Sequence, residues 1–516
     1  MLAHRRPILF FSISASVLVL TTLPYLLAGR AASPAHVFGG FLINPLDGNT
    51  YLAKMYQGWQ GDWRFTLPYT AEPGEGAYLF IFYVFLGHLA GALGLELPLT
   101  FHVARLLGTL ALLLALDHFF TTWLTGQRQQ VLAFGLAALG SGLGWLAAPF
   151  GAFTSDLWVV EAYPFLSAYA TPHFSLGLAL LLWVLSARGR SEWLVAPAAL
   201  ALSIISPFGV VIALAVLGGM ALWEFSPSIF SLLRLPANLP NLAAGRPFLL
   251  ALLFGVPFLL YDVWIAWTDP VLTGWNAQNL TPSPLLGDLL ISFSPLLPLA
   301  LVGAWVVWKR QTGAERLLLV WMALGFLLLY LPFGLQRRFM MGLYIPVAGL
   351  AACGLEILAG GRRLKLSGKL LFLLVLPTNL VVLLAGWHGV QTHDRLLFLT
   401  VEEAHAFDWM ANNTPPEALV LASPETGLFI PAYCGRRVIY GHPFETVRAA
   451  EEEAAALGYF LGAGTDRALL EKRGVDYVFF GERERALAGN TGLAGLQPVY
   501  STGQVTIYAV NRLSIR

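Results

Sequence analysis

An acidic residue, Asp47, lies just beyond the first hydrophobic segment, at the start of a polar and aromatic stretch unsuited to crossing a bilayer. The same stretch contains Trp59, Trp63 and, towards its far end, Glu72. A carboxylate within hydrogen-bond reach of a hydroxyl group can take up its proton, so Asp47 is a candidate general base. These residues also fit an ordinary belt of interfacial tryptophans with solvated charges. Glu72 is accordingly either a substrate-binding residue or a solvated loop acid.

A second polar stretch, residues 151–173, holds Asp156, Glu161 and His173 between two hydrophobic segments. Ionisable groups near membrane depth are costly unless they have partners or a function, so we expect Glu161 to be catalytic and Asp156 and His173 to bind substrate. The alternative is that His173 begins the next span as an interfacial residue and that Asp156 is solvated. Carboxylates and waters are ligands that suit Mg²⁺ or Mn²⁺, but the sequence does not establish that a metal is bound.

Basic residues supply the third group of candidates. Arg337 and Arg338 stand side by side before a later hydrophobic segment, and two guanidinium groups can bind a phosphate bidentately. The alternative is an anchor to ordinary anionic headgroups. Arg105 lies near the start of another hydrophobic segment, together with His102. We include Arg105 among the substrate-binding candidates, although a structural pair with a loop acid is the simpler interpretation.

Composition defines the class of protein that must position these residues. The 516 residues are 57% hydrophobic and 12% charged, whereas soluble globular proteins carry about 25% charged residues. We therefore expect a polytopic α-helical protein of the cell (plasma or inner) membrane. The net charge of +1 gives no reason to expect a nucleic-acid partner. The two cysteines, Cys353 and Cys434, form neither a disulfide framework nor a metal motif.

Hydrophobic runs predict the membrane spans, each of which needs about 20 apolar residues. We expect about eleven crossings, with the run 194–225 divided into two short spans at Ser206-Pro207. The predicted runs are 8–28, 99–124, 131–150, 174–187, 194–225, 248–267, 286–308, 317–332, 339–359 and 370–387. The first run follows His4, Arg5 and Arg6, and we interpret it as a retained span with its basic end in the cytoplasm.

The sidedness of the loops follows from the basic loop 361–369, which the positive-inside rule places in the cytoplasm. Counting backward puts the loop 151–173 and the chain after 387 outside. The apolar segment 78–95 conflicts with this count if it crosses the membrane. We interpret it as a helix that dips into the membrane from the outer loop. The alternative makes it a span and 194–225 a single pass, with a poorer charge distribution.

The composition changes at about residue 394 to acids, Asn, Pro and Gly. Strands are predicted at 418–421, 438–440, 475–480 and 505–510, with helices at 402–412, 446–460 and 466–473 between them. Strands that alternate with helices indicate a small α/β domain. We therefore expect a transmembrane domain over 1–393, with outer loops at 29–98 and 151–173, and a soluble extracytoplasmic domain over 394–516.

This layout resembles the GT-C superfamily of membrane glycosyltransferases, which includes protein O-mannosyltransferases, aminoarabinose transferases and oligosaccharyltransferase subunits. The shared features are an early acid in a long first loop, here Asp47, a dipping helix at 78–95, a second acidic loop and a soluble tail. The tail stretches NTPPEALVLASPETGLFIPAYCGRRVIYGHPFET and VDYVFFGERE are similar to those of bacterial GT-C-like proteins. Two features differ: Gly48 follows Asp47 where an acidic pair is expected for an O-mannosyltransferase, and no WWD-type motif is present.

The resemblance implies a polyprenyl-phosphate-linked sugar as donor and transfer on the extracytoplasmic face, with inversion at the sugar. It identifies Asp47 with the first-loop acid, which serves as base or metal ligand depending on the branch of the family, and Asp156 or Glu161 with the second-loop acid. Arg337 and Arg338 correspond to the donor-phosphate contact by location only. The resemblance does not determine whether the acceptor is a lipid, a glycan or a protein. Two other functions remain: a flippase or transporter of lipid-linked saccharides, and a non-catalytic scaffold that displays the tail domain.

Overall fold

The computed structural model describes residues 2–231, 245–310, 313–359, 364–462, 467–487, 493 and 495–510. Part of the basic loop used to assign sidedness, including Arg362 and Arg363, lies outside these residues, as does the tail beyond 510. The chain divides into two compact units. The helical unit comprises residues 1–24, 102–261 and 281–385, and the loop–tail unit comprises residues 25–101, 262–280 and 386–516.

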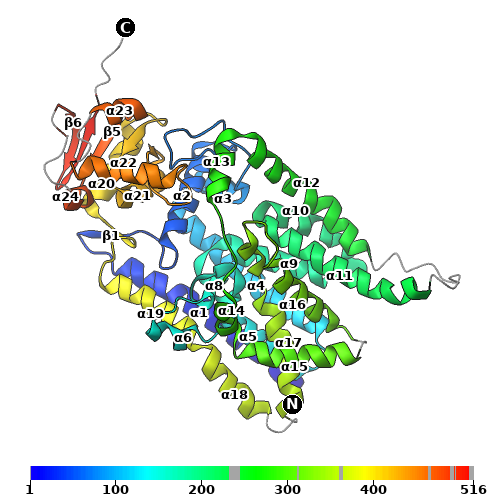
Figure 1. Ribbon diagram of the computed structural model, residues 1–516. Helices are drawn as coiled ribbons and strands as arrows, with labels where there is room; N and C mark the ends of the chain where they lie inside the picture. The colour runs from blue at the N-terminus through cyan, green and yellow to red at the C-terminus, as the bar shows by residue number, and fades with distance from the viewer. Residues whose placement is uncertain are drawn as a thin grey trace. The chain divides into compact units, whose positions relative to one another are not determined.

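The predicted polytopic helical character is confirmed (Figure 1). The helices that lie wholly or partly in the helical unit are α1 (Leu2–Arg30), α4 (Leu97–Trp123), α5 (Gln127–Leu139), α6 (Gly144–Ala147), η1 (Ala148–Phe150), α7 (Ser155–Trp158), η2 (Val160–Ala162), α8 (Pro164–Ala170), α9 (Pro172–Ser186), η3 (Gly189–Leu194), α10 (Val195–Ile205), α11 (Pro207–Ser231), α12 (Arg246–Thr268), α14 (Leu286–Phe293), α15 (Leu296–Arg310), α16 (Arg316–Leu328), η5 (Gln336–Met340), α17 (Tyr344–Ala359), α18 (Leu364–Val375) and α19 (Pro377–Gln391).

The expected count of about eleven spans is not confirmed. Among the described residues, six helices are long and apolar enough to cross a membrane, or up to eight if each of two bent pairs is one span. Several predicted spans are helices too short for that test, and the run 194–225 does break at Ser206, between α10 and α11. Helix α3 (Ile81–Leu93) has 13 residues. At 1.5 Å per residue it is about 20 Å long, short of the ~30 Å hydrocarbon core.

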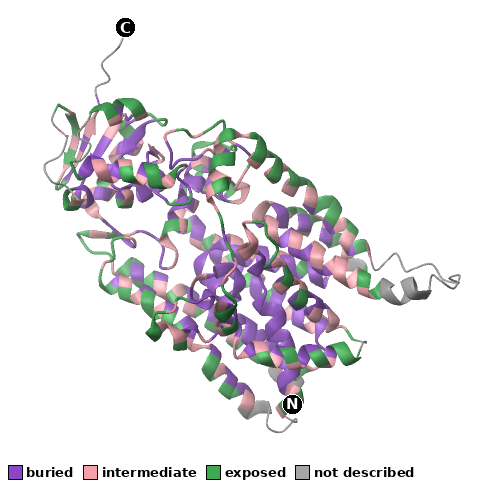
Figure 2. Ribbon diagram, in the orientation of Figure 1, coloured by how far each residue is buried: buried purple, intermediate pink, exposed green. Residues whose placement is uncertain are grey.

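The candidate span Gln336–Ala359, which comprises η5 and α17, is the most buried of those described: 83% of its apolar window is buried, against 11% for α12 (Figure 2). Glycines let α15 and α17 approach closely. A Cβ added at Gly303 would lie 2.0 Å from the Leu350 carbonyl oxygen, and one added at Gly354 would lie 2.1 Å from that of Leu299. Such small-residue contacts replace the hydrophobic driving force, which is weak between helices surrounded by lipid.

The loop–tail unit is mixed α/β, as predicted for its tail. Its elements are β1 (His36–Phe38), α2 (Pro45–Gln60), α3, α13 (Pro270–Gln278), β2 (Phe398–Thr400), α20 (Val401–Asn413), β3 (Leu419–Leu421), α21 (Pro424–Cys434), β4 (Arg437–Val438), α22 (Ala449–Phe460), α23 (Arg467–Arg473), β5 (Tyr477–Phe480), α24 (Glu482–Leu487), β6 (Gln497–Thr502) and β7 (Val505–Ala509). Five strands form one sheet in the order β4-β3-β5-β7-β6. The first three are parallel, and β7 and β6 are antiparallel additions.

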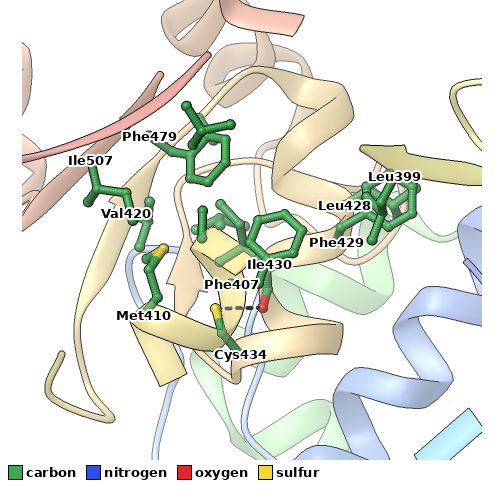
Figure 3. Packing of buried hydrophobic residues seen from close by; sticks show 14 of the residues in the cluster. Leu399, Phe407, Met410, Val420, Leu428, Phe429, Ile430, Cys434, Phe479 and Ile507 are labelled. Carbon is green, nitrogen blue, oxygen red and sulfur yellow. Dashed lines mark hydrogen bonds between the residues drawn. The ribbon is translucent and has the colours of Figure 1, made fainter. Parts of the chain in front are cut away.

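Alternating side chains give this sheet two covered faces. On one face Val420 and Phe479 pack with Phe407 of α20 and Phe429 of α21 (Figure 3). On the other face the neighbouring strand residues pack against α22 and α23; this cluster includes Leu421, Tyr459, Phe460, Leu470 and Val478. The strands predicted at 418–421, 475–480 and 505–510 are confirmed, whereas β4 overlaps the strand predicted at 438–440 only at Val438. Strand β6 and the small β1–β2 sheet were not predicted.

The first long loop packs with the tail inside this unit. Strand β1 pairs antiparallel with β2, with Val37 opposite Leu399. The Tyr69 hydroxyl donates to the Leu428 carbonyl oxygen at 3.0 Å, and Tyr69 belongs to the same buried cluster as Phe429. Compact packing thus groups residues 25–101 with the tail, across the boundary predicted at 394. The division into a transmembrane and a soluble domain stays a prediction.

Candidate functional site

Asp47 lies in the first turn of α2. The helix begins after Asn44, whose left-handed conformation (φ 47°) is one that asparagine tolerates, and Pro45 occupies the first position, where its missing N–H is not needed. The positive end of the helix dipole favours a carboxylate at this place. The Asp47 side chain is 50% exposed, so it is accessible to a substrate hydroxyl.

A buried histidine of the tail, His442, lies close to the Asp47 carboxylate. The Nε2 atom of His442 is 3.6 Å from Asp47 Oδ1, and the His442 side chain is 2% exposed. Its other ring nitrogen, Nδ1, accepts hydrogen bonds from the backbone N–H groups of Phe444 at 3.1 Å and Glu445 at 3.2 Å. The sequence analysis did not identify His442. A half-exposed acid backed by a buried imidazole is an arrangement that can accept and hold a proton.

A buried ion pair lies further along the same face of α2. Lys54 is about two turns after Asp47, and its Nζ is 2.7 Å from Glu445 Oε1 and 3.2 Å from Thr50 Oγ1. The ammonium group also lies 4.3 Å from the centre of the Phe80 ring. Lys54 is 1% exposed and Glu445 is 9% exposed, so each charge needs the other. The tail therefore contacts this face of α2 through both His442 and Glu445.

Glu72, predicted to bind substrate, makes an exposed ion pair. Its Oε1 is 3.6 Å from Arg448 Nη2, and its side chain is 68% exposed. Arg448 also lies near Glu451 and Glu452, at 3.8 Å each. Exposed pairs of this kind contribute about 0–1 kcal/mol. The contact supports the solvated-acid interpretation, and the substrate-binding role stays a prediction.

In the helical unit the structure brings together Glu161 and Arg338, two residues selected separately from the sequence. Arg338 Nη1 is 3.3 Å from Glu161 Oε1, with side chains 39% and 7% exposed. The backbone joins the same two segments, since the N–H of Gly342 donates to the Glu161 carbonyl oxygen at 2.9 Å. The Arg337 guanidinium lies 4.6 Å from the centre of the Trp158 ring. The structure thus places Arg338 beside the buried Glu161 carboxylate and Arg337 beside Trp158, and guanidinium groups are strong donors to anions.

Asp156 lies in a hydrogen-bonded network and is fully buried. It accepts from Thr154 Oγ1 at 2.6 Å, from the N–H of Gly144 at 2.8 Å and from Ser292 Oγ at 3.2 Å. Burial raises the pKa of Asp156, and the hydrogen bonds oppose this shift without cancelling it. Asp288 extends the network by accepting from Ser292 at 2.6 Å. These hydrogen bonds favour a structural role for Asp156, which fixes α7 against α6 and α14. Direct contact of Asp156 with substrate stays a prediction.

The two remaining candidates have contacts of a structural kind. Arg105 is 1% exposed and donates to the carbonyl oxygens of Thr21 at 2.8 Å and Ala168 at 3.0 Å, and to His102 Nδ1 at 3.2 Å. It therefore ties α1, α4 and α8 together. His173 lies in the first turn of α9, with its ring 3.9 Å from that of Phe174. Substrate binding by Arg105 and His173 stays a prediction.

The part of the chain that the structure describes contains no preformed set of metal ligands. No group of three or more His, Cys, Asp or Glu side chains there is placed to hold one. Asp47 and His442 belong to the loop–tail unit, whereas Asp156 and Glu161 belong to the helical unit. The described residues of each unit therefore do not fit an Mg²⁺ or Mn²⁺ site, and we derive no step through a metal.

No protein-family model matches the sequence, and no curated protein matches it. Solved structures do match the fold. The apo crystal structure of the Archaeoglobus fulgidus oligosaccharyltransferase has a TM-score of 0.51 and 15% identity, over 98% of this chain and 75% of that chain. The same organism's oligosaccharyltransferase AglB, in complex with an inhibitory peptide and a dolichol-phosphate, has a TM-score of 0.50 and 15% identity, with the same coverage.

A third structure, ArnT from Cupriavidus metallidurans bound to undecaprenyl phosphate, has a TM-score of 0.47 and 12% identity, over 97% of this chain and 99% of that chain. A likeness at that level adds nothing to the assignment. The likeness to the archaeal enzyme extends over nearly the whole of this chain. At 15% identity it concerns the fold alone. The chain has the fold of the archaeal oligosaccharyltransferase, which is the GT-C fold that the sequence resembles.

Proposed function

We propose that this protein is a membrane glycosyltransferase that moves a sugar from a polyprenyl-phosphate-linked donor to an acceptor on the extracytoplasmic face. The observation that carries the proposal is the half-exposed carboxylate of Asp47, at the N-terminus of a helix in the first long loop of a chain with this fold. The fold supports the donor class, because the archaeal oligosaccharyltransferase was solved with a dolichol-phosphate.

In the proposed reaction Asp47 takes the proton from an acceptor hydroxyl group. The oxygen attacks the anomeric carbon of the sugar, a new glycosidic bond forms, and the bond to the lipid phosphate breaks. The electron pair leaves with the phosphate oxygen, and a single displacement inverts the anomeric centre. The Asp47 carboxylate suits the first step because it is half-exposed and because a carboxylate can take the proton of a hydroxyl group.

Arg337 and Arg338 are proposed to stabilise the negative charge that develops on the departing lipid phosphate. Guanidinium groups form strong, bidentate hydrogen bonds with phosphate oxygens. Donors fixed before the reaction stabilise the transition state more than donors that must reorganise. Glu161, 3.3 Å from Arg338, supplies such fixation by holding one guanidinium group in place. We therefore propose for Glu161 an orienting part in catalysis.

The test is a comparison of cells that lack the gene with cells that carry wild-type protein, Asp47→Asn, or Arg337→Ala combined with Arg338→Ala. Mass spectrometry of envelope glycans and of polyprenyl-linked sugars is the measurement. We expect both variants to lose the glycan product and to accumulate the lipid-linked donor. Asp62→Asn, at an exposed acid beyond the far end of α2, is the matched control and should behave as wild type. Full product formation by Asp47→Asn would overturn the proposal.

The same lipid extract separates transfer from transport. Detergent-solubilised protein has access to donor and acceptor without a membrane barrier between them. A transferase converts the polyprenyl-linked sugars extracted from cells that lack the gene, whereas a flippase leaves them unchanged. Absence of conversion by soluble, folded wild-type protein, with envelope lysate supplied as the source of acceptor, would favour the transporter.

A further inference from the structure

We infer that His442 is a positioning residue for Asp47, and that the tail domain serves the reaction by supplying it. The inference rests on the proposed function, since it takes Asp47 to be the base. It assigns a role to the tail that neither the fold likeness nor the first-loop acid implies. The contact lies wholly within the loop–tail unit, between α2 and the turn after β4.

The turn holds the imidazole in one orientation. Both partners of His442 Nδ1 are backbone N–H groups, so Nδ1 carries no proton and the ring is the Nε2–H tautomer. Thr446 closes the turn. Its N–H donates to the His442 carbonyl oxygen at 3.0 Å, and its Oγ1 accepts from the N–H of His442 at 3.3 Å. The ring is therefore fixed before any substrate arrives.

The other ring nitrogen, Nε2, lies near the base. It lies 3.6 Å from Asp47 Oδ1, and Nε2 is buried without a hydrogen-bond partner among the described residues. A buried donor without a partner is unfavourable, and a small rotation of the half-exposed Asp47 carboxylate towards Nε2 would give this donor an acceptor. Catalytic hydrogen bonds are often long before substrate binds and shorten in the complex. One carboxylate oxygen would then face His442 and the other would face the acceptor hydroxyl.

The charges around Asp47 suit this role. A cation in contact with a carboxylate makes it a weaker base, whereas a neutral N–H donor orients it at smaller cost in basicity. Lys54 is a cation about two turns further along the same face of α2, and Glu445 binds it at 2.7 Å. The tail turn thus supplies both the neutral donor to Asp47 and the carboxylate that pairs with Lys54.

Two substitutions separate the functions of the two ring nitrogens. His442→Asn keeps an acceptor where Nδ1 stands, because an Asn side-chain oxygen accepts from the N–H groups two and three residues ahead, but it removes the donor to Asp47. His442→Gln places a donor near the position of Nε2. Transfer is assayed with the polyprenyl-linked sugars extracted from cells that lack the gene. The concentration of this extract is varied from limiting to saturating, so that kcat and KM are obtained separately.

We expect His442→Asn to lower kcat about tenfold to a hundredfold with little change in KM, because a misplacement of about 1 Å can cost a factor of 10². His442→Gln should recover part of this loss, and His442→Asn should add nothing to Asp47→Asn. Unchanged thermal melting of His442→Asn checks that the turn is intact. Full activity of His442→Asn beside an inactive Asp47→Asn overturns the positioning role alone, whereas an active Asp47→Asn overturns the proposed function and this role together.

A spectroscopic measurement tests the contact without substrate. Protein labelled with ¹⁵N-histidine is compared with His442→Asn to identify the His442 signals, and then with Asp47→Asn. We expect the Nε2–H tautomer in wild type and a shift of the Nε2 resonance in Asp47→Asn. An Nδ1–H tautomer, or an Nε2 resonance that Asp47→Asn leaves unchanged, would overturn the inference.

Discussion

At the scale of single residues, the loop–tail unit contains a buried ion pair whose loss should lower stability. Lys54 and Glu445 are both nearly inaccessible and 2.7 Å apart. Substituting Lys54→Met should lower the free energy of unfolding by about 3–5 kcal/mol, because it leaves the Glu445 carboxylate buried without a counter-charge. Combining it with Glu445→Leu should recover most of the loss. Thermal melting monitored by tryptophan fluorescence measures both, and a double variant no more stable than Lys54→Met alone would contradict this account.

Asp156 gives a prediction for pH at the same scale. Burial raises its pKa in the folded protein above the unfolded value of about 3.9. The folded protein therefore binds this proton more tightly than the unfolded chain does. The resulting stabilisation by Asp156 is fully present below the unfolded pKa and is lost as the pH rises through the raised folded pKa. The melting temperature of wild type relative to Asp156→Asn should therefore fall as the pH rises from about 4, the unfolded pKa. A difference that stays constant as the pH rises from about 4, or that grows with pH, would contradict the raised pKa.

At the scale of elements, α2 and α3 pack through two glycines. A Cβ at Gly58 would lie 2.0 Å from the Val84 carbonyl oxygen, and one at Gly87 would lie 1.9 Å from that of Met55. Gly87→Ala should therefore force the helices apart and destabilise the unit by about 1–3 kcal/mol. Gly458→Ala is the matched control, because it lies within α22 with nothing within 4 Å of its Cβ position, and it should be neutral or slightly stabilising. Equal melting temperatures for the two variants would contradict close packing of α2 and α3.

At the scale of the whole molecule, the tail depends on the first loop. Strand β2 pairs with β1, and Ala53 and Tyr69 complete the cluster around Phe429. Residues 394–516 expressed alone should therefore exchange the backbone amides of α21 faster than the full-length protein does. Hydrogen exchange read by mass spectrometry, with β7 as internal reference, measures this. Equal protection of α21 in both would mean that the tail folds independently of the first loop.

The sequence by itself determined the membrane class, most helices and the strands of the tail. These features depend on local hydrophobic periodicity and on turn residues, which the sequence displays directly. It also selected Asp47, Glu161 and Arg338 as candidate site residues, because ionisable residues next to hydrophobic runs are conspicuous. The number of spans was harder to predict from the sequence. Apolar helices such as α9 and α16 have fewer residues than a span requires, and the two helices of a bent pair look like one continuous run in the sequence.

Only the tertiary structure decided which of these residues meet. Lys54 and Glu445 are 391 positions apart, and no periodicity relates α2 to the turn after β4. His442 was missed for the same reason: the stretch from Gly441 to Thr446 shows a polar turn, but not the surface it faces. Tertiary packing also showed Asp156 to be held by three hydrogen-bond donors. Contacts between distant segments depend on the packing of whole elements, and local sequence does not encode that packing in readable form.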